Sequence, residues 1–183
     1  MRSSSYNRPL SLRELLGKRT LIAGEVKKGK TELTGEMLNL FLKEGYKVAF
    51  LDMAPEMIKG IGGKFKPTPQ PLSFIYLTTE IFAPRLTAKS PEERDGLAQA
   101  NAVSIERMFE EYRRRPSDVL FINDISIYLQ AGDLESLWDV ISLSKKAVIN
   151  GYYGKTLGED PLSQRERREM DRLIEKCDRV IWL

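Results

Sequence analysis

The sequence lacks histidine altogether, and its 183 residues contain a single cysteine, Cys177. Without histidine, the available general bases are carboxylates, lysine and tyrosine, and zinc sites built on imidazole are excluded. One cysteine forms no internal disulfide, which suits a reducing compartment, so we expect a cytoplasmic protein. No apolar run approaches the roughly 20 residues of a membrane helix, and residues 1–16 contain no apolar signal core. The sequence therefore predicts neither membrane association nor secretion.

An excess of charge of one sign is also missing. The 29 basic and 26 acidic residues are interspersed and give a formal net charge of +3. This balance gives no electrostatic indication of a nucleic-acid partner. The length suits one domain with a real core and is short for two, so we expect a single domain over residues 1–183, with an N-terminal segment and short helix in residues 1–18. The oligomeric state stays open, and a homo-oligomer is compatible with the sequence.

Strand and helix patterns alternate along the chain. Apolar runs predict strands at 19–24, 47–53, 72–79, 118–124, 146–153 and 178–183. Capped or amphipathic segments predict helices at 11–18, 30–44, 90–115, 132–145 and 161–177. Residues 54–71 and 80–90 are expected to be loops. Apolar strands separated by helices are typical of a parallel sheet covered on both faces, so we expect a three-layer α/β fold with a mostly parallel sheet of five to six strands.

The stretch "GEVKKGKT" at residues 24–31 fits the phosphate-loop pattern G-x-x-x-x-G-K-[ST], also called Walker A. It follows a predicted strand and opens a predicted helix, which is the context that the mechanism needs, since loop amides and the helix N-terminus surround phosphate oxygens. Lys30 is expected to reach the β- and γ-phosphates, and Thr31 to ligate Mg²⁺. The residues predicted to bind the nucleotide are Gly24, Glu25, Val26, Lys27, Lys28, Gly29, Lys30, Thr31 and Glu32. The sequence thus predicts a P-loop NTPase domain that uses ATP and Mg²⁺.

Two further acids end predicted strands, where ligands of such sheets sit. Asp124 ends "VLFIND" and is predicted to bind Mg²⁺ with Thr31 or to orient a water molecule. The residue before it is Asn123, which supplies no charge where a first acid is usual. Asp52 ends "VAFLD" and is predicted to support the metal or to activate a second substrate. For both acids the alternative is a turn-forming role, and Lys30, Asp124 and Asp52 are the predicted catalytic residues.

Other charged residues are interpreted as solvated. Arg85 follows a predicted strand and could meet a phosphate, but a solvated loop arginine is the preferred interpretation. The charged helix at 161–177 is expected to have a solvated face. The N-K-x-D pattern of guanine-specific enzymes is missing, because the corresponding place reads "INGYYGKT" (149–156), so ATP is preferred to GTP.

The order of segments resembles the P-loop ATP:corrinoid adenosyltransferases, which have a RecA-like domain. The stretches that carry the likeness are the glycine loop, "YLQAGDL" (128–134), "INGYY" (149–153) and "CDRVIWL" (177–183). The resemblance implies ATP as cofactor. Its usual acids D-E are Asn123-Asp124 here, and its T-G-R is Asn150-Gly151-Tyr152, which implies a shared scaffold with altered chemistry.

The segment "GKTELTGEMLNLFLKEGYKVAFLD" (29–52) is also similar to the opening of polynucleotide 5′-hydroxyl kinases. That resemblance implies that Asp52 helps to activate an acceptor. Two classes of function stay open: an Mg²⁺-dependent ATPase or ATP-dependent transferase acting on an unknown second substrate, and a regulatory module that binds ATP without turning it over.

Overall fold

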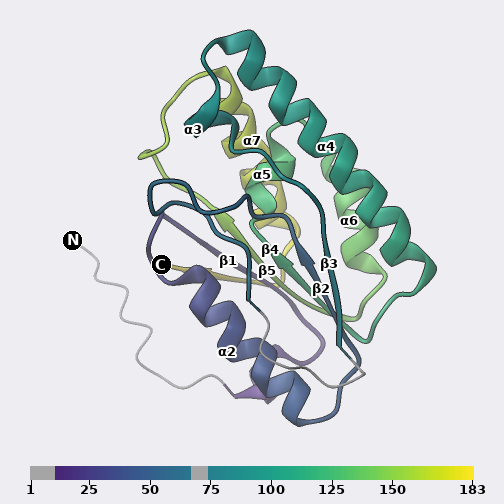
Figure 1. Ribbon diagram of the computed structural model, residues 1–183. Coiled ribbons are helices and arrows are strands. Elements are labelled where there is room, and N and C mark those ends of the chain that lie inside the picture. The colour runs from purple at the N-terminus through teal and green to yellow at the C-terminus, as the bar shows by residue number, and fades with distance from the viewer. Residues whose placement is uncertain (1–10, 67–73) are drawn as a thin grey trace.

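The computed structural model describes residues 11–66 and 74–183, in which six strands form one sheet of order β3-β2-β4-β5-β1-β6. The strands are β1 (Arg19–Gly24), β2 (Val48–Asp52), β3 (Phe74–Thr78), β4 (Val119–Asn123), β5 (Lys146–Tyr152) and β6 (Arg179–Trp182). Every neighbouring pair is parallel. The predicted α/β class is therefore confirmed, and the described sheet is parallel throughout (Figure 1).

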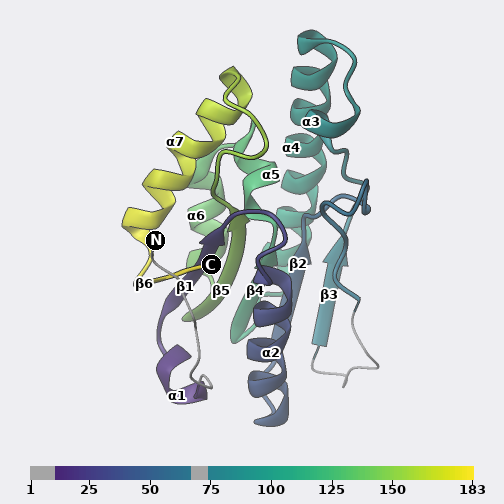
Figure 2. The ribbon, with the colours of Figure 1, turned by 90° about the vertical axis from the view of Figure 1, so that its left-hand side faces the viewer.

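Helices cover both faces of the sheet and make the outer two layers. They are α1 (Leu12–Leu15), α2 (Lys30–Lys43), α3 (Pro84–Thr87), α4 (Pro91–Arg114), α5 (Ile125–Leu129), α6 (Leu134–Ser142) and α7 (Pro161–Lys176). Figure 2 shows α2 in front of the sheet and α4, α5 and α6 behind it. None of the helices in the described residues is both long and apolar enough to cross a membrane.

The strands divide their side chains between two cores. Leu21, Leu51 and Ile122 belong to the core under α4, α5, α6 and α7, whereas Ile22 and Phe50 belong to the core under α1 and α2. Successive side chains of a strand point to opposite faces, and both faces are covered here. This double burial explains why the strands read as apolar runs without alternation.

Most helix ends are where the sequence predicts them. Ser11 and Glu14 form the predicted capping box of α1. Ser90 accepts a hydrogen bond from the Glu93 amide at 3.1 Å and begins α4, with Pro91 at the first helical position. These local signals work because each one satisfies an amide at a helix N-terminus.

Two short helices were not predicted. Residues 80–90 were expected to be a loop but contain α3, where Pro84 begins one helical turn. Helix α5 is buried on every side, so it shows no polar face from which a helical period can be recognised. Parts of the predicted N-terminal segment, loop 54–71 and strand 72–79 lie outside the described residues, namely 1–10 and 67–73.

The carboxyl edge of the sheet carries a row of buried polar side chains. Asp52 of β2 is paired in register with Asn123 of β4, and Asn150 lies on the neighbouring β5. This is the edge at which open parallel sheets bind their ligands. The loop between β1 and α2 begins at the same edge (Figure 1).

Candidate functional site

The loop between β1 and α2 has the backbone geometry of an anion site. Gly29 has a φ of +81° and is the N-cap of α2, and the Leu33 amide donates to the Gly29 carbonyl at 2.9 Å. Helical amides before that point have no carbonyl partner within the helix. They lie at the positive end of a 14-residue helix, which favours a bound anion.

A cavity of about 470 Å³ lies against this loop. Seven of the nine residues predicted to bind nucleotide line it, namely Val26, Lys27, Lys28, Gly29, Lys30, Thr31 and Glu32. The loop's own lysines therefore border the cavity and leave it open. A volume of this size is within the range of small-molecule sites.

Gly24 and Glu25 are outside the cavity lining. A Cβ at Gly24 would lie 2.0 Å from the carbonyl oxygen of Leu183, so the residue permits a close approach of two chain segments. The Glu25 carboxylate accepts hydrogen bonds from the amides of Lys155 at 2.7 Å and Thr156 at 3.4 Å. Burial opposes its ionisation, but these bonds hold the pKa of Glu25 below its usual value. Glu25 therefore ties the phosphate loop to the loop after β5.

The Lys30 ammonium lies across its own loop. Its Nζ donates to the carbonyl of Gly24 at 2.9 Å and also to the carbonyl of Glu25. Burial lowers the pKa of Lys30, while the negative charges of Asp124 and Glu25 act in the opposite direction. The ammonium is thus held at the cavity by acceptors that a phosphate oxygen could replace.

Asn123 connects Thr31 to Asp52. The Thr31 hydroxyl lies 3.5 Å from Asn123 Oδ1, and Asn123 Nδ2 donates to Asp52 Oδ1 at 2.8 Å. Asn150 Nδ2 donates to Asn123 Oδ1 at 2.9 Å and to the Thr34 hydroxyl at 2.9 Å. A buried polar network therefore runs from β2 through β4 and β5 to α2.

Asp52 is fully buried and accepts four hydrogen bonds. Besides Asn123, the donors are the Ala54 amide at 3.1 Å, the Phe65 amide at 2.6 Å and the Tyr76 hydroxyl at 2.7 Å. A carboxylate offers about four lone-pair sites, so these bonds use them all. Asp52 is absent from the cavity lining and is connected to it through two lining residues, Asn123 and Ala54. Its bonds also fix both ends of the segment from Ala54 to Phe65.

Asp124 lines the same cavity as Lys30 and Thr31. Its backbone has a φ of +60°, a left-handed conformation that is uncommon for a residue other than glycine. Ser126 Oγ donates to its carboxylate at 2.6 Å, and its own amide donates to Asn150 Oδ1 at 2.9 Å. Burial raises the pKa of Asp124, against the hydrogen bond from Ser126 and the positive charge of Lys30. This carboxyl group is a stronger base than a solvated one.

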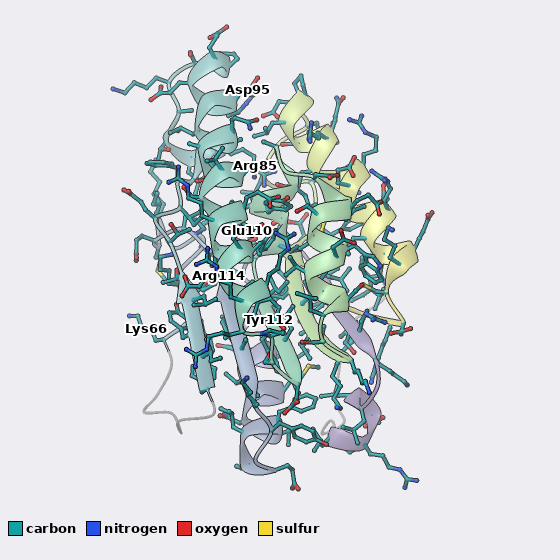
Figure 3. All side chains as sticks on the ribbon, turned by 90° about the vertical axis from the view of Figure 1, so that its right-hand side faces the viewer. Lys66, Arg85, Asp95, Glu110, Tyr112 and Arg114 are labelled. Atoms are coloured by element: carbon teal, nitrogen blue, oxygen red, sulfur yellow. The ribbon has the colours of Figure 1, made fainter. Side chains whose placement is uncertain are left out.

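Arg85 and Glu166 correct two expectations from the sequence. Arg85 was expected to be a solvated loop residue, and Glu166 to lie on a solvated helix face. They form an ion pair at 2.7 Å with side chains that are 8% and 3% exposed. Burial raises the pKa of Glu166 to about 7, with the Arg85 charge acting in the opposite direction. Figure 3 shows Arg85 on the side of α4 that faces α7.

The position of Arg85 is fixed from several sides. Its guanidinium also donates to Ser163 Oγ at 3.2 Å and lies 5.3 Å from the centre of the Tyr152 ring. The side chain of Asn101 in α4 holds the preceding segment, since it accepts from the Phe82 amide at 2.8 Å and donates to the Phe82 carbonyl at 3.0 Å. Arg85 lines the cavity opposite the phosphate loop. The pairing of Arg85 with Glu166 was not predicted, because the two residues are 81 positions apart in the chain.

The donors at the cavity suit a hard cation. Thr31, Asn123 and Asp124 offer a hydroxyl, an amide oxygen and a carboxylate, and Mg²⁺ prefers oxygen ligands. Within the described residues there is no group of three or more His, Cys, Asp or Glu side chains that could hold a metal ion by themselves. Mg²⁺ usually binds with few protein ligands together with substrate phosphates, so the residues present fit that ion.

The fold and the loop together define a class. A six-stranded parallel sheet, covered on both faces, joins its first strand to its first long helix through a glycine loop at the ligand edge. Strand β5 lies between β1, which leads into the loop, and β4, which leads to Asp124. The observed class is a three-layer α/β fold with a parallel sheet and a glycine loop at its ligand edge.

No known family model matches the sequence, and no curated protein matches it in sequence. Among solved structures, a similar one is the flagellar accessory protein FlaH from Methanocaldococcus jannaschii. The two share 13% sequence identity with a TM-score of 0.43, over 84% of this chain and 68% of that one. At that TM-score the likeness assigns no function to this chain.

Proposed function

We propose that this protein binds ATP with Mg²⁺ and catalyses hydrolysis or transfer of its terminal phosphoryl group. The observation that carries the proposal is that one cavity is lined by the phosphate loop, Lys30, Thr31 and Asp124. Phosphoryl transfer depends mostly on positioning and on neutralising charge. The four features supply amide donors, a cation, a metal ligand and a base around one space.

Each residue has a role that follows from its place. Amides of the loop and of the first turn of α2 bind phosphate oxygens, and Lys30 leaves the carbonyls of Gly24 and Glu25 to pair with them. Thr31 and Asp124 are placed to hold Mg²⁺, which would neutralise negative charge on the phosphates. Asp124, with its raised pKa, is also placed to orient a nucleophile and to accept its proton.

Asp52 is proposed as a positioning residue. Its carboxylate holds Asn123 Nδ2, so Asn123 Oδ1 is directed toward the hydroxyl of Thr31. The carboxylate of Asp52, on the neighbouring strand β2, thus supplies the negative charge that an acid at position 123 would otherwise supply. An acid there would lie directly against Asp52, whereas the amide donates to it.

Lys30 provides the direct test. Lys30→Ala is expected to lose measurable binding of a fluorescent ADP analogue and Mg²⁺-dependent ATP turnover. Lys43→Ala is the matched control, because Lys43 is exposed on the last turn of the same helix. Equal nucleotide affinity in wild type and Lys30→Ala would contradict the proposal.

The products separate phosphoryl from adenosyl chemistry. Hydrolysis or phosphoryl transfer yields ADP, whereas the adenosyl transfer implied by the corrinoid resemblance releases the triphosphate chain. We expect ADP, because Lys30, Thr31 and Asp124 line one cavity and so offer a cation, a metal ligand and a carboxylate around a transferred phosphoryl group. Triphosphate among the products would assign the chain to the adenosyl class.

A regulatory ATP-binding module is the second candidate, and Asn123 is the observation that favours it. The position carries no charge and is part of a saturated network. This candidate is distinguished by tight nucleotide binding that Lys30→Ala abolishes, together with no ATP turnover in the wild type.

A further inference from the structure

The phosphate loop lines only part of the cavity, and a second wall lines another part. That wall consists of the glycine-rich segment after β2, helix α3 and helix α5, and it contains Pro55, Met57, Ile61, Ala83, Leu86 and Ile127. These side chains are apolar, and the ammonium of Lys27 borders the same segment, because it lies 3.4 Å from the place of a Cβ at Gly60. Burying apolar ligand surface against them is favourable. The wall therefore suits a ligand with an apolar body.

The charge of Arg85 is already balanced. Arg85 lines the α3 part of the wall, and Glu166 neutralises it at 2.7 Å. Ser163 and the Tyr152 ring take further contacts of the guanidinium. An anionic ligand would have to compete with a buried carboxylate for Arg85, so the wall favours a neutral ligand over an anionic one.

Gln130 leaves one hydrogen-bond acceptor without a partner. The residue lines the cavity, is 2% exposed, and donates through Nε2 to Glu166 at 2.8 Å. Its Oε1 is buried and has no hydrogen-bond partner within residues 11–66 and 74–183. An unpaired buried acceptor is uncommon and costs free energy until a donor reaches it. A ligand that supplies an O–H or N–H group would satisfy this oxygen after a small rotation of the amide.

Asp124 lies between this wall and the phosphate loop. It lines the cavity together with Lys30, with whose charge it interacts, and it accepts a hydrogen bond from Ser126 of the α5 segment at 2.6 Å. A nucleophile bound at the wall would therefore face both the carboxylate and the phosphates.

We propose that this half of the cavity binds the acceptor of the phosphoryl group, and that the acceptor is a small, neutral, mostly apolar molecule with a hydroxyl or amine group. The inference rests on the proposed function. In the transfer, the acceptor oxygen or nitrogen bonds to the γ-phosphorus. The bond from that phosphorus to the bridging oxygen breaks, and its electron pair leaves with ADP. The acceptor proton is released to water.

The test uses four probes that share one fluorinated ring: 4-fluorobenzyl alcohol, 4-fluoroaniline, 4-fluorobenzoate and 4-fluorotoluene. Their binding to the full chain is measured by ¹⁹F NMR relaxation, with and without MgADP. We expect the alcohol to bind about fivefold more tightly than the toluene, which is the effect of one net hydrogen bond. The amine should share this preference, and the benzoate should bind most weakly.

Two variants locate the site. Gln130→Leu should reduce the alcohol to the affinity of the toluene, whereas Gln99→Leu, the same change at an exposed position of α4, should leave the preference unchanged. Leu86→Trp, on the partly exposed helix α3, should fill the wall and abolish binding of the alcohol. If Gln130→Leu fails to unfold cooperatively, Leu86→Trp and the wild-type preference decide the question.

The inference is overturned by tightest binding of the benzoate, by equal binding of alcohol and toluene, by no binding of any probe, or by full alcohol binding in Leu86→Trp. A fluorescent ADP analogue is titrated into the same samples. No nucleotide binding together with an intact alcohol preference would reject the proposed function and leave the wall as a ligand site without a phosphoryl donor. Nucleotide binding without that preference would reject the acceptor site alone.

Discussion

The phosphate loop and the second wall, which includes Arg85, line one cavity but are built in opposite ways. The loop consists of eight consecutive residues, and its polar groups are backbone amides and one lysine that a ligand can engage. The wall depends on Arg85, Gln130 and Glu166, which come from α3, the end of α5 and α7. Its charges are buried and paired with each other. The polar groups of the loop are therefore accessible to a ligand, whereas the charges of the wall are part of the folded core. We expect substitutions in the loop to change ligand binding and substitutions in the wall to change the unfolding free energy.

The largest expected effect is on stability, at the wall. Glu166→Ala leaves the Arg85 charge buried without its partner and should lower the unfolding free energy by about 3–5 kcal/mol at pH 8. The double variant Arg85→Met, Glu166→Leu should recover most of this loss. Urea denaturation measures both. Glu135→Ala, which removes an exposed ion pair with Arg172, is the control and should cost less than about 1 kcal/mol.

The next effect is on binding and turnover, at the loop. Lys30→Ala should reduce ATP turnover on the order of 100-fold, the size typical of removing one group that stabilises developing charge. Its unfolding free energy should change by less than about 1 kcal/mol, because burial already disfavours the charged lysine. Steady-state kinetics and urea denaturation on the same sample check both. A large fall in the unfolding free energy of Lys30→Ala would show that the loop, like the wall, contributes strongly to stability.

Asn123→Asp tests the polar network between the two regions. It places a second carboxylate against Asp52, where Nδ2 now donates at 2.8 Å. We expect a loss of about 2 kcal/mol at pH 8, from a lost hydrogen bond and like-charge repulsion. Urea denaturation of both proteins measures the loss. An unchanged unfolding free energy would contradict the repulsion.

A pH dependence should come from the wall. Burial raises the pKa of Glu166 from 4.5 to about 7, so between these values the folded chain holds a proton that the unfolded chain releases. The stabilising contribution is complete below pH 4.5 and is lost as the pH rises through about 7. Urea denaturation across this window should show a fall in the wild type and a smaller fall in Glu166→Gln. An equal fall would assign it to other groups.

The smallest effect concerns the tie between the phosphate loop and the loop after β5. A Cβ at Gly154 would lie 2.2 Å from a carboxylate oxygen of Glu25, so Gly154→Ala should displace that flexible side chain. Losing the bonds to the amides of Lys155 and Thr156 should cost about 1 kcal/mol and weaken ADP-analogue binding about fivefold. Glu25→Gln, which keeps a hydrogen-bond acceptor, should lie between this variant and the wild type. If Gly154→Ala bound the ADP analogue as tightly as the wild type, the bonds from Glu25 to the loop after β5 would have no role in nucleotide binding.

The same contrast explains what the sequence could predict. The parallel α/β fold was predictable because both-sided burial leaves apolar strands, and because caps such as Ser90 are local. The phosphate loop was predictable because its chemistry needs consecutive residues. Asp52, Asn123 and Asp124 could be singled out since each ends, or directly follows, an apolar strand.

The wall could not be predicted for equally physical reasons. Arg85 and Glu166 are charged, and charged residues are usually solvated, so each alone was expected at the surface. Their burial depends on a pairing between segments 81 residues apart. Helix α3 is one turn long and α5 is buried throughout, so neither shows an amphipathic period. Gln130 carried no signal beyond its place in "YLQAGDL".

Asn101 gives the wall a mechanical property. The side-chain amide of Asn101 accepts a hydrogen bond from the Phe82 amide and donates one to the Phe82 carbonyl, as the backbone of a neighbouring strand would. With Arg85 fastened to Glu166 a few residues later, the short α3 segment is pinned at two places to two different helices. A ligand in the cavity would therefore contact, on that side, a backbone segment that is held at two points, and its shape would have to fit that segment as it is folded.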